Sequence, residues 1–249
     1  FLMKVKLEIR HYMIFFLSIL ELIGMFKYGF SLVFLHVFVA LLSALLIDTI
    51  ANFIKLKRFI ISPSTIITGL IVAGVLSFDS SNHLLIAAIA SAVAVLAKQF
   101  IAYNKKHIFN PASIGILVVS IFFTSAVSWW AASNIWLTII FGVFILYKLR
   151  KYELTLSYLI AHSIIVIAIA IFTKSSILPN LALTNPYFVS FMLIEPITSP
   201  LKKKARIVYG SLVAVISLIS LQIFPAIDHS IAGLLVANAI SRLLDKRFG

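Results

Sequence analysis

The sequence predicts an all-α polytopic membrane protein whose ten transmembrane segments form two inverted five-helix repeats with short or broken helices. Three observations lead to this prediction: an extreme apolar composition, basic residues confined to alternate connections, and several apolar segments too short to cross a bilayer. Of the 249 residues, 62% are hydrophobic and 12% are charged, and the mean hydropathy is +1.11. Soluble domains carry about 25% charged residues, so the composition excludes an ordinary soluble protein.

Ten apolar segments account for most of the chain and are expected to be helices that enter the membrane. In chain order they lie near residues 11–26, 29–54, 63–78, 83–99, 111–128, 133–149, 153–173, 185–195, 205–224 and 229–244. When the flanking residues are assigned alternately to two sides, 19 of the 21 Lys and Arg residues fall on the side of the N-terminus. Because cytoplasmic loops are enriched in Lys and Arg, we expect a cell (inner or cytoplasmic) membrane protein with both termini in the cytoplasm.

The basic excess, a formal net charge of +13, is therefore interpreted as a signal for membrane orientation. It predicts contact with the lipid bilayer and its anionic headgroups, and no nucleic-acid partner. The chain contains no Cys, which excludes disulfides and Cys-ligated iron–sulfur or zinc sites.

The predicted organisation is one transmembrane domain over residues 1–249, with a first repeat at 1–128 and a second, inverted repeat at 129–249. Five segments per half is an odd number, which forces the halves into opposite orientations. Short echoes occur in matching order. Ser62 and Pro63 open the third segment, as Asn185 and Pro186 open the eighth. IFNPASIG (residues 108–115) opens the fifth, and IFPAIDHSIAG (residues 223–233) opens the tenth.

The third, fifth, eighth and tenth segments are short and begin at helix-capping residues. Asn110 followed by Pro111 is a favourable helix start. A helix from there to Phe123 is about 20 Å long, too short for a hydrocarbon core of about 30 Å. The eighth segment begins at Asn185 and is stopped by Pro196. Broken helices at matching positions of two repeats indicate a binding site near the membrane midplane, and their N-termini suit an anionic or acceptor-rich ligand.

A family resemblance is carried by four motifs that occur in a fixed order. They are SPSTIITG (62–69), AKQFIAYNKKHIFNPASIGILVVSIFF (97–123), FMLIEPITSP (191–200) and ARIVYGSLVAVISLIS (205–220). The chain resembles the NqrB/RnfD family, the membrane flavoprotein subunits of the sodium-pumping NADH:quinone reductase and of Rnf complexes, over roughly residues 45–245. The family usually has Asp where this chain has Glu195. The resemblance implies two inverted five-helix repeats, transmembrane electron transfer with flavin, and partners that are other membrane and redox subunits.

One feature of that family is absent from this sequence. Family members carry a Ser-Gly-Ala-Thr-type motif, after the fifth segment, whose Thr holds FMN through a phosphoester. Here SWWAASN (residues 128–134) joins the fifth and sixth segments almost directly, and no such motif occurs anywhere in the chain. We therefore expect no covalent FMN, and a flavin (FMN or riboflavin) or a quinone held without a covalent bond.

Two sets of candidate residues follow from the broken helices, the resemblance and the acidic residues within apolar segments. The candidate cofactor-binding residues are Ser64, Thr65, Thr68, Asn110, Ser113, Glu195, Thr198 and Ser199. The candidate residues for an ion or proton path are Glu21, Asp48, Glu195 and Asp228. No catalytic residues and no metal ligands are predicted.

Each candidate also has a plainer interpretation that the sequence leaves open. Asp228 suits the N-cap of the tenth segment, Glu195 suits the cap of a helix break, and Asp48 lies close enough to Lys55 to sit at the cytoplasmic interface. The aromatic residues Trp129, Trp130 and Trp136 are expected in a belt at the outer membrane interface.

The predicted function is that of an NqrB/RnfD-like membrane subunit of an electron-transfer complex that couples electron transfer to ion movement. It would be a redox subunit of an oxidoreductase complex and not a catalyst alone. Two alternatives stay open: a channel or transporter for a small solute, because inverted repeats with broken helices also build transporters, and a structural subunit without a cofactor.

Overall fold

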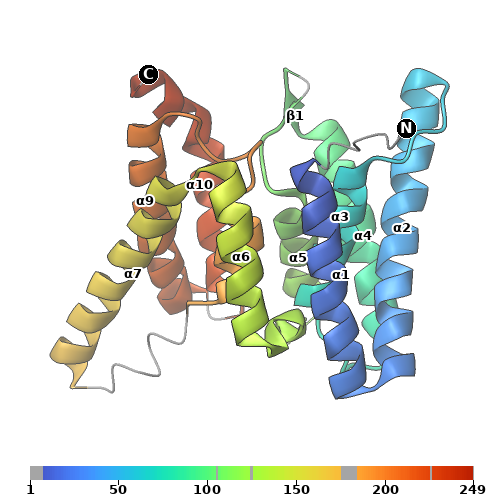
Figure 1. Cartoon of the computed structure of the whole chain (residues 1–249), viewed down its shortest axis with the longest axis horizontal. Helices are drawn as coiled ribbons and strands as arrows, with labels where there is room; N and C mark the ends of the chain where they lie inside the picture. The colour runs from blue at the N-terminus through green and yellow to red at the C-terminus, as the bar shows by residue number, and fades with distance from the viewer. Residues whose placement is uncertain (1–7, 105, 124–125, 175–183, 225, 249) are drawn as a thin grey trace, which may run out of the picture.

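The computed structural model describes residues 8–104, 106–123, 126–174, 184–224 and 226–248, and the chain is almost entirely helical there (Figure 1). Five helices are long and apolar enough to cross a membrane, which makes the chain a multi-pass membrane protein by length and composition. They are α1 (Ile9–Tyr28), α2 (Phe30–Leu56), α4 (His83–Phe100), α7 (Tyr152–Thr173) and α9 (Lys203–Ile223).

The remaining helices are shorter or more polar. Three short apolar helices are α3 (Pro63–Val75), α5 (Pro111–Phe122) and α6 (Ile135–Leu149), and α10 (His229–Arg247) ends in a charged last turn. The eighth segment contains a π-helix, η2 (Phe188–Met192), and a 3-10 turn, η1 (Trp130–Ser133), precedes α6. At 12 residues α5 is about 18 Å long, which confirms the expected short helix, although it ends several residues before the predicted boundary at 128.

Caps and prolines explain where the short helices begin. Pro63 and Pro111 each occupy a first-turn position, where the missing N–H is not needed. Asn185 begins the eighth segment, since its Oδ1 accepts hydrogen bonds from the backbone N–H groups of Tyr187 (2.8 Å) and Phe188 (3.4 Å). These starts confirm the sequence prediction. Pro225, part of the echo before α10, lies outside the described residues.

The helices alternate in direction, so connections collect at two opposite ends of the molecule. In Figure 1, the start of α1 and the end of α10 lie at the same end of the molecule. The hairpin of β1 (Ala102–Tyr103) and β2 (Lys106–His107) lies there too. The turn after α2 and the turn between α6 and α7 lie at that end too. We call it the basic end, because the Lys and Arg clusters of residues 55–58, 148–151 and 202–206 belong to it. The hairpin itself was not predicted.

The two halves of the chain share a packing pattern. In the first half α2 packs on α4, α4 on α5 and α1 on α3, and in the second half α7 packs on α9, α9 on α10 and α6 on η2. Gly115 on α5 lies so near α4 that a Cβ would fall 2.1 Å from the Ala90 carbonyl oxygen. Gly233 on α10 likewise leaves only 2.8 Å from a Cβ to the Val213 oxygen of α9. Each glycine is five residues after the N-cap of its helix.

The halves meet through a smaller set of elements. Helix α1 contacts α6 and η1, α3 contacts η1, and α5 contacts α10. One hydrophobic cluster extends across these contacts, from Leu17 of α1 and Val72 of α3 to Phe188 of η2 and Leu234 of α10, all fully buried. The hydrophobic core is therefore continuous from the first half of the chain to the second.

Candidate functional site

The start of α5 is fixed by Asn110. Its side-chain Oδ1 caps the helix by accepting from the Ser113 N–H at 3.0 Å and the Ser113 hydroxyl at 3.2 Å. Its Nδ2 donates to the Met192 carbonyl at 3.5 Å, and its backbone N–H donates to Asn238 Oδ1 at 2.9 Å. Asn110 is 3% exposed, so this residue ties the beginning of α5 to the eighth segment and to α10 inside the protein.

Glu195 lies just after η2 and is held on several sides. Its Oε1 lies 2.9 Å from His107 Nε2 of the hairpin, and its Oε2 accepts from the Thr198 hydroxyl at 3.0 Å. The Glu195 carbonyl accepts from the Ser199 hydroxyl at 2.5 Å and from Lys151 Nζ at 3.4 Å. The carboxylate is thus positioned by the hairpin and by its own turn.

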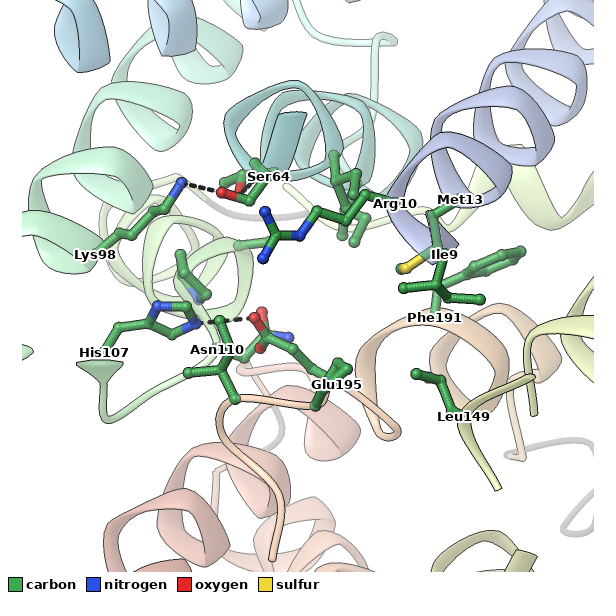
Figure 2. Close-up of a pocket in the computed structure, with 17 residues that line it drawn as sticks. Ile9, Arg10, Met13, Ser64, Lys98, His107, Asn110, Leu149, Phe191 and Glu195 are labelled. Atoms are coloured by element: carbon green, nitrogen blue, oxygen red, sulfur yellow. Dashed lines mark hydrogen bonds and ion pairs between the residues drawn. The ribbon is translucent and has the colours of Figure 1, made fainter. Parts of the chain in front are cut away.

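A cavity of about 280 Å³ opens between four parts of the chain. They are the start of α5, the turn that begins at Glu195, α1 and α3. The polar lining of the cavity is Arg10, Ser64, Thr68, Lys98, His107, Asn110 and Glu195. Figure 2 shows Arg10 reaching in from α1, Lys98 bonded to Ser64, and His107 bonded to Glu195. Apolar side chains such as Met13, Ile71 and Phe191 complete the wall. The cavity is therefore mostly apolar with a few convergent polar groups, as small-molecule sites are.

A second polar network supports the cavity from the first half. Lys98 Nζ donates to Ser64 Oγ at 2.7 Å and to Thr65 Oγ1 at 3.0 Å. Thr65 in turn donates to Asp48 Oδ2 at 2.8 Å, and Gln99 Nε2 donates to Asp48 Oδ1 at 2.8 Å. Asp48 is 2% exposed, so its carboxylate is satisfied by two donors and belongs to the frame that positions Lys98.

Positive charge predominates around the cavity. Arg10 and Lys98 are cations, and no described carboxylate pairs with Arg10. Glu195 is the one carboxylate in the described lining, and His107 lies beside it. Close by, burial and then the Arg206 guanidinium lower the pKa of Lys151 to about 8, although Glu195 and Asp245 oppose the shift. The site suits an anionic or acceptor-rich ligand.

The structure brings together most of the predicted cofactor-binding residues. Ser64, Thr68, Asn110 and Glu195 line the cavity. Thr65, Ser113, Thr198 and Ser199 do not line it, but each is hydrogen-bonded to a lining residue. Three lining residues that the sequence analysis did not single out are Arg10, Lys98 and His107. Each belongs to a basic cluster that the sequence analysis interpreted only as a signal for membrane orientation.

Two of the predicted ion-path residues lie elsewhere. Asp228 caps α10 through the Ile231 N–H at 3.0 Å and accepts from Trp129 Nε1 at 2.8 Å, which confirms its plainer interpretation. Glu21 is buried within α1. The expected aromatic belt is wrong for Trp130, which is 4% exposed and donates to the Ala73 carbonyl at 2.7 Å. The turn η1 packs on α3 and brings the Trp130 N–H to that carbonyl, a contact that a hydropathy pattern does not reveal. Trp136, in contrast, is exposed.

The fold and the site together define a class: a helical multi-pass membrane protein with a cavity lined by residues of both halves of the chain. No protein-family model and no curated protein matches this chain.

Proposed function

We propose that this chain is an NqrB/RnfD-like membrane subunit of an electron-transfer complex that holds a flavin, without a covalent bond, in the cavity at the start of α5. The observation that carries the proposal is the donor set of the cavity. Arg10 and Lys98 bring N–H donors and positive charge to a space with apolar walls. Such a set suits a planar ring with several hydrogen-bond acceptors.

The size of the cavity agrees with that ligand class. About 280 Å³ is just below the usual range of about 300 to 1,000 Å³ for small-molecule sites. It fits a ring system such as isoalloxazine or a quinone head. A bound flavin would supply one- and two-electron chemistry, and positive charge beside its ring tunes that chemistry. Lys98 and Arg10 would provide the charge, while Phe191 and Ile71 exclude water from the ring.

The ten-segment inverted repeat is part of the same proposal. It is supported by the matched packing of α2, α4 and α5 with α7, α9 and α10, and by the glycine five residues after the N-caps Asn110 and Asp228. We further propose that the basic end is cytoplasmic, in the cell membrane, since positive charge is retained on that side.

The proposal includes partner subunits that carry further redox groups. It has no Cys to ligate an iron–sulfur cluster, and among the described residues no group of three or more His, Asp or Glu side chains could hold a metal ion. We propose that a flavin in this chain receives and passes electrons through redox groups on other membrane and redox subunits.

The test is flavin binding by the purified full-length chain in lipid nanodiscs. FMN or riboflavin is added, and quenching of the flavin fluorescence is measured. We expect saturable binding near one flavin per chain that Lys98→Met weakens at least tenfold, while Lys148→Met, an exposed lysine of α6, leaves it unchanged. In denaturing electrophoresis we expect the polypeptide to carry no flavin fluorescence, because the covalent attachment motif is absent.

Other results would assign the chain to another class. Absence of flavin binding, together with flux of a small neutral solute into liposomes, would favour a channel. Absence of both would favour a structural subunit. A fluorescent polypeptide band would show covalent attachment and contradict the proposal on that point.

A further inference from the structure

Glu21 is a carboxyl group buried inside the protein without a hydrogen-bond donor for one of its oxygens. It lies on α1, is 1% exposed, and its neighbours Leu17 and Leu20 are equally buried. No described residue donates a hydrogen bond to its Oε1. An ionised carboxylate in such surroundings is strongly disfavoured, so the charge of this side chain must be neutralised by a proton or a cation.

The hydroxyl of Tyr187 is the polar group that faces Glu21 from the second half. Tyr187 is fully buried, and its hydroxyl also has no hydrogen-bond partner in the described part of the chain. Both groups converge on Gly74 of α3, where a Cβ would lie 3.5 Å from Glu21 Oε1 and 2.9 Å from the Tyr187 hydroxyl oxygen. The absence of a side chain at Gly74 lets the two groups approach each other across the junction of the halves.

Few other titratable groups reach this place. Of the elements that pack on α1, α3 and η1 contain none. On α2, His36 lies 3.3 Å from His83 between their Nδ1 atoms, and its buried Nε2 has no partner among the described residues. Asp48 is bonded to Thr65, and Lys55 lies in the last turn of α2 and donates to Gln99. On α6, Tyr147 and Lys148 lie in the last turn, which belongs to the basic end. Tyr187 is the titratable residue that lies with Glu21 beside Gly74.

A proton and a metal cation make different demands on such a site. Hard cations such as Ca²⁺ or Mg²⁺ take about six or more oxygen ligands, whereas this pair offers one carboxyl and one hydroxyl among apolar side chains. The described residues contain no group of three or more acidic or His side chains that could hold a metal. A proton needs only the carboxylate oxygen, and the hydroxyl can then accept a hydrogen bond from the acid.

We propose that Glu21 and Tyr187 form a proton-binding site at the junction of the two halves. Glu21 holds the proton as a neutral acid. When that proton passes to a solvent water molecule, the Tyr187 hydroxyl turns to donate a hydrogen bond to the carboxylate. The inference goes beyond the proposed function and does not depend on flavin binding, because it concerns the resting protein.

The test is infrared spectroscopy of the full-length chain in lipid at neutral pH, in H₂O and after transfer to D₂O. We expect a carbonyl-stretch band of a protonated carboxylic acid that disappears in Glu21→Gln and shifts on transfer to D₂O. Tyr187→Phe should keep the band and change its frequency, since the polar hydroxyl that faces the Glu21 carboxyl is removed. The matched control is Asp48→Asn, which removes a buried carboxylate already satisfied by two donors and should leave the band intact.

Several outcomes would overturn the site. If Glu21→Gln removes a carboxylate band instead, Glu21 is ionised. If the Glu21 band does not shift in D₂O, the proton does not exchange and the acid is a structural group. If Tyr187→Phe leaves the frequency unchanged, Tyr187 is not the partner. Glu21→Gln preserves the shape of the side chain and its neutral charge, and Tyr187→Phe leaves Glu21 in place. Either variant therefore tests the site if the other fails to fold.

Discussion

Asn238 shows how much one side chain contributes to the candidate site. It is 1% exposed, accepts from the Asn110 N–H, and donates to the Tyr209 hydroxyl at 2.6 Å and to the Thr198 carbonyl at 3.5 Å. It thereby joins α10, α9, the start of α5 and the turn after Glu195. Leaving such buried groups without partners costs about 1–3 kcal/mol each, so Asn238 holds these elements in one register.

Lys151 gives a pH dependence at the basic end. Burial lowers its pKa from an ordinary 10.5 to about 8, so between pH 8 and 10.5 the unfolded chain binds more protons than the folded one. Stability should therefore rise with pH across this window. At about 1.4 kcal/mol per pH unit for one proton, the gain approaches about 3 kcal/mol. The apparent Tm in detergent should rise from pH 8 to 10, and this rise should vanish in Lys151→Met.

The matched control for this prediction is Lys148→Met, because the Lys148 side chain is exposed. It should retain the wild-type rise in Tm. An equal rise in Lys151→Met would assign the pH dependence to another group.

The N-caps of α5 and α6 allow the effect of a mutation on stability to be distinguished from its effect on ligand binding. Asn110 and Asn134 each cap a helix through one side-chain oxygen, to Ser113 N at 3.0 Å and to Leu137 N at 3.1 Å. Loss of a cap costs about 1 kcal/mol. We expect Asn110→Ala and Asn134→Ala both to lower the Tm. Only Asn110→Ala should also weaken flavin binding, measured by fluorescence quenching, since Asn134 does not line the cavity. Equal binding in the two variants would remove Asn110 from the site.

The close packing of α5 on α4 and of α10 on α9 predicts that a side chain at either contact glycine lowers stability. A Cβ at Gly115 would meet the backbone of α4, and one at Gly233 would meet the Ser217 hydroxyl and the backbone of α9. Because the helices must move apart to admit it, we expect Gly115→Ala and Gly233→Ala each to lose about 1–3 kcal/mol, measured by thermal unfolding. Ile121→Ala, an exposed position on α5, should lose less. A neutral Gly115→Ala would contradict the close approach of α4 and α5.

The sequence predicted the helices well because hydropathy, capping residues and prolines act locally. It located Asn110, Asn185 and Asp228 as helix starts, and the structure has each of them there. The π-turn of η2 and the role of Asn238 depend on contacts between distant segments, which no local pattern contains. Arg10 and Lys98 were missed for a different reason: both lie on the basic side of the membrane, so the orientation rule already accounted for their charge.

At the scale of the whole molecule, the alternating directions of the helices predict a defined topology. The chain has no native Cys, so single cysteines can be introduced at exposed positions and labelled from one side of intact cells. We expect Ser80→Cys and Ser128→Cys to react with an impermeant maleimide from outside. Lys204→Cys should react only after the membrane is opened. Labelling of Lys204→Cys and Ser80→Cys from the same side would contradict the arrangement in Figure 1.

The cavity takes its walls from both halves, and this has a consequence for how the protein is made. Arg10, Ser64, Lys98 and Asn110 are synthesised early, whereas Phe191 and Glu195 emerge late in translation. The first five helices can reach their mutual contacts while the rest of the chain is still on the ribosome. Any small molecule that belongs in the cavity must then be loaded after the eighth segment has been inserted. Nascent chains truncated before residue 185 should accordingly insert into the bilayer empty.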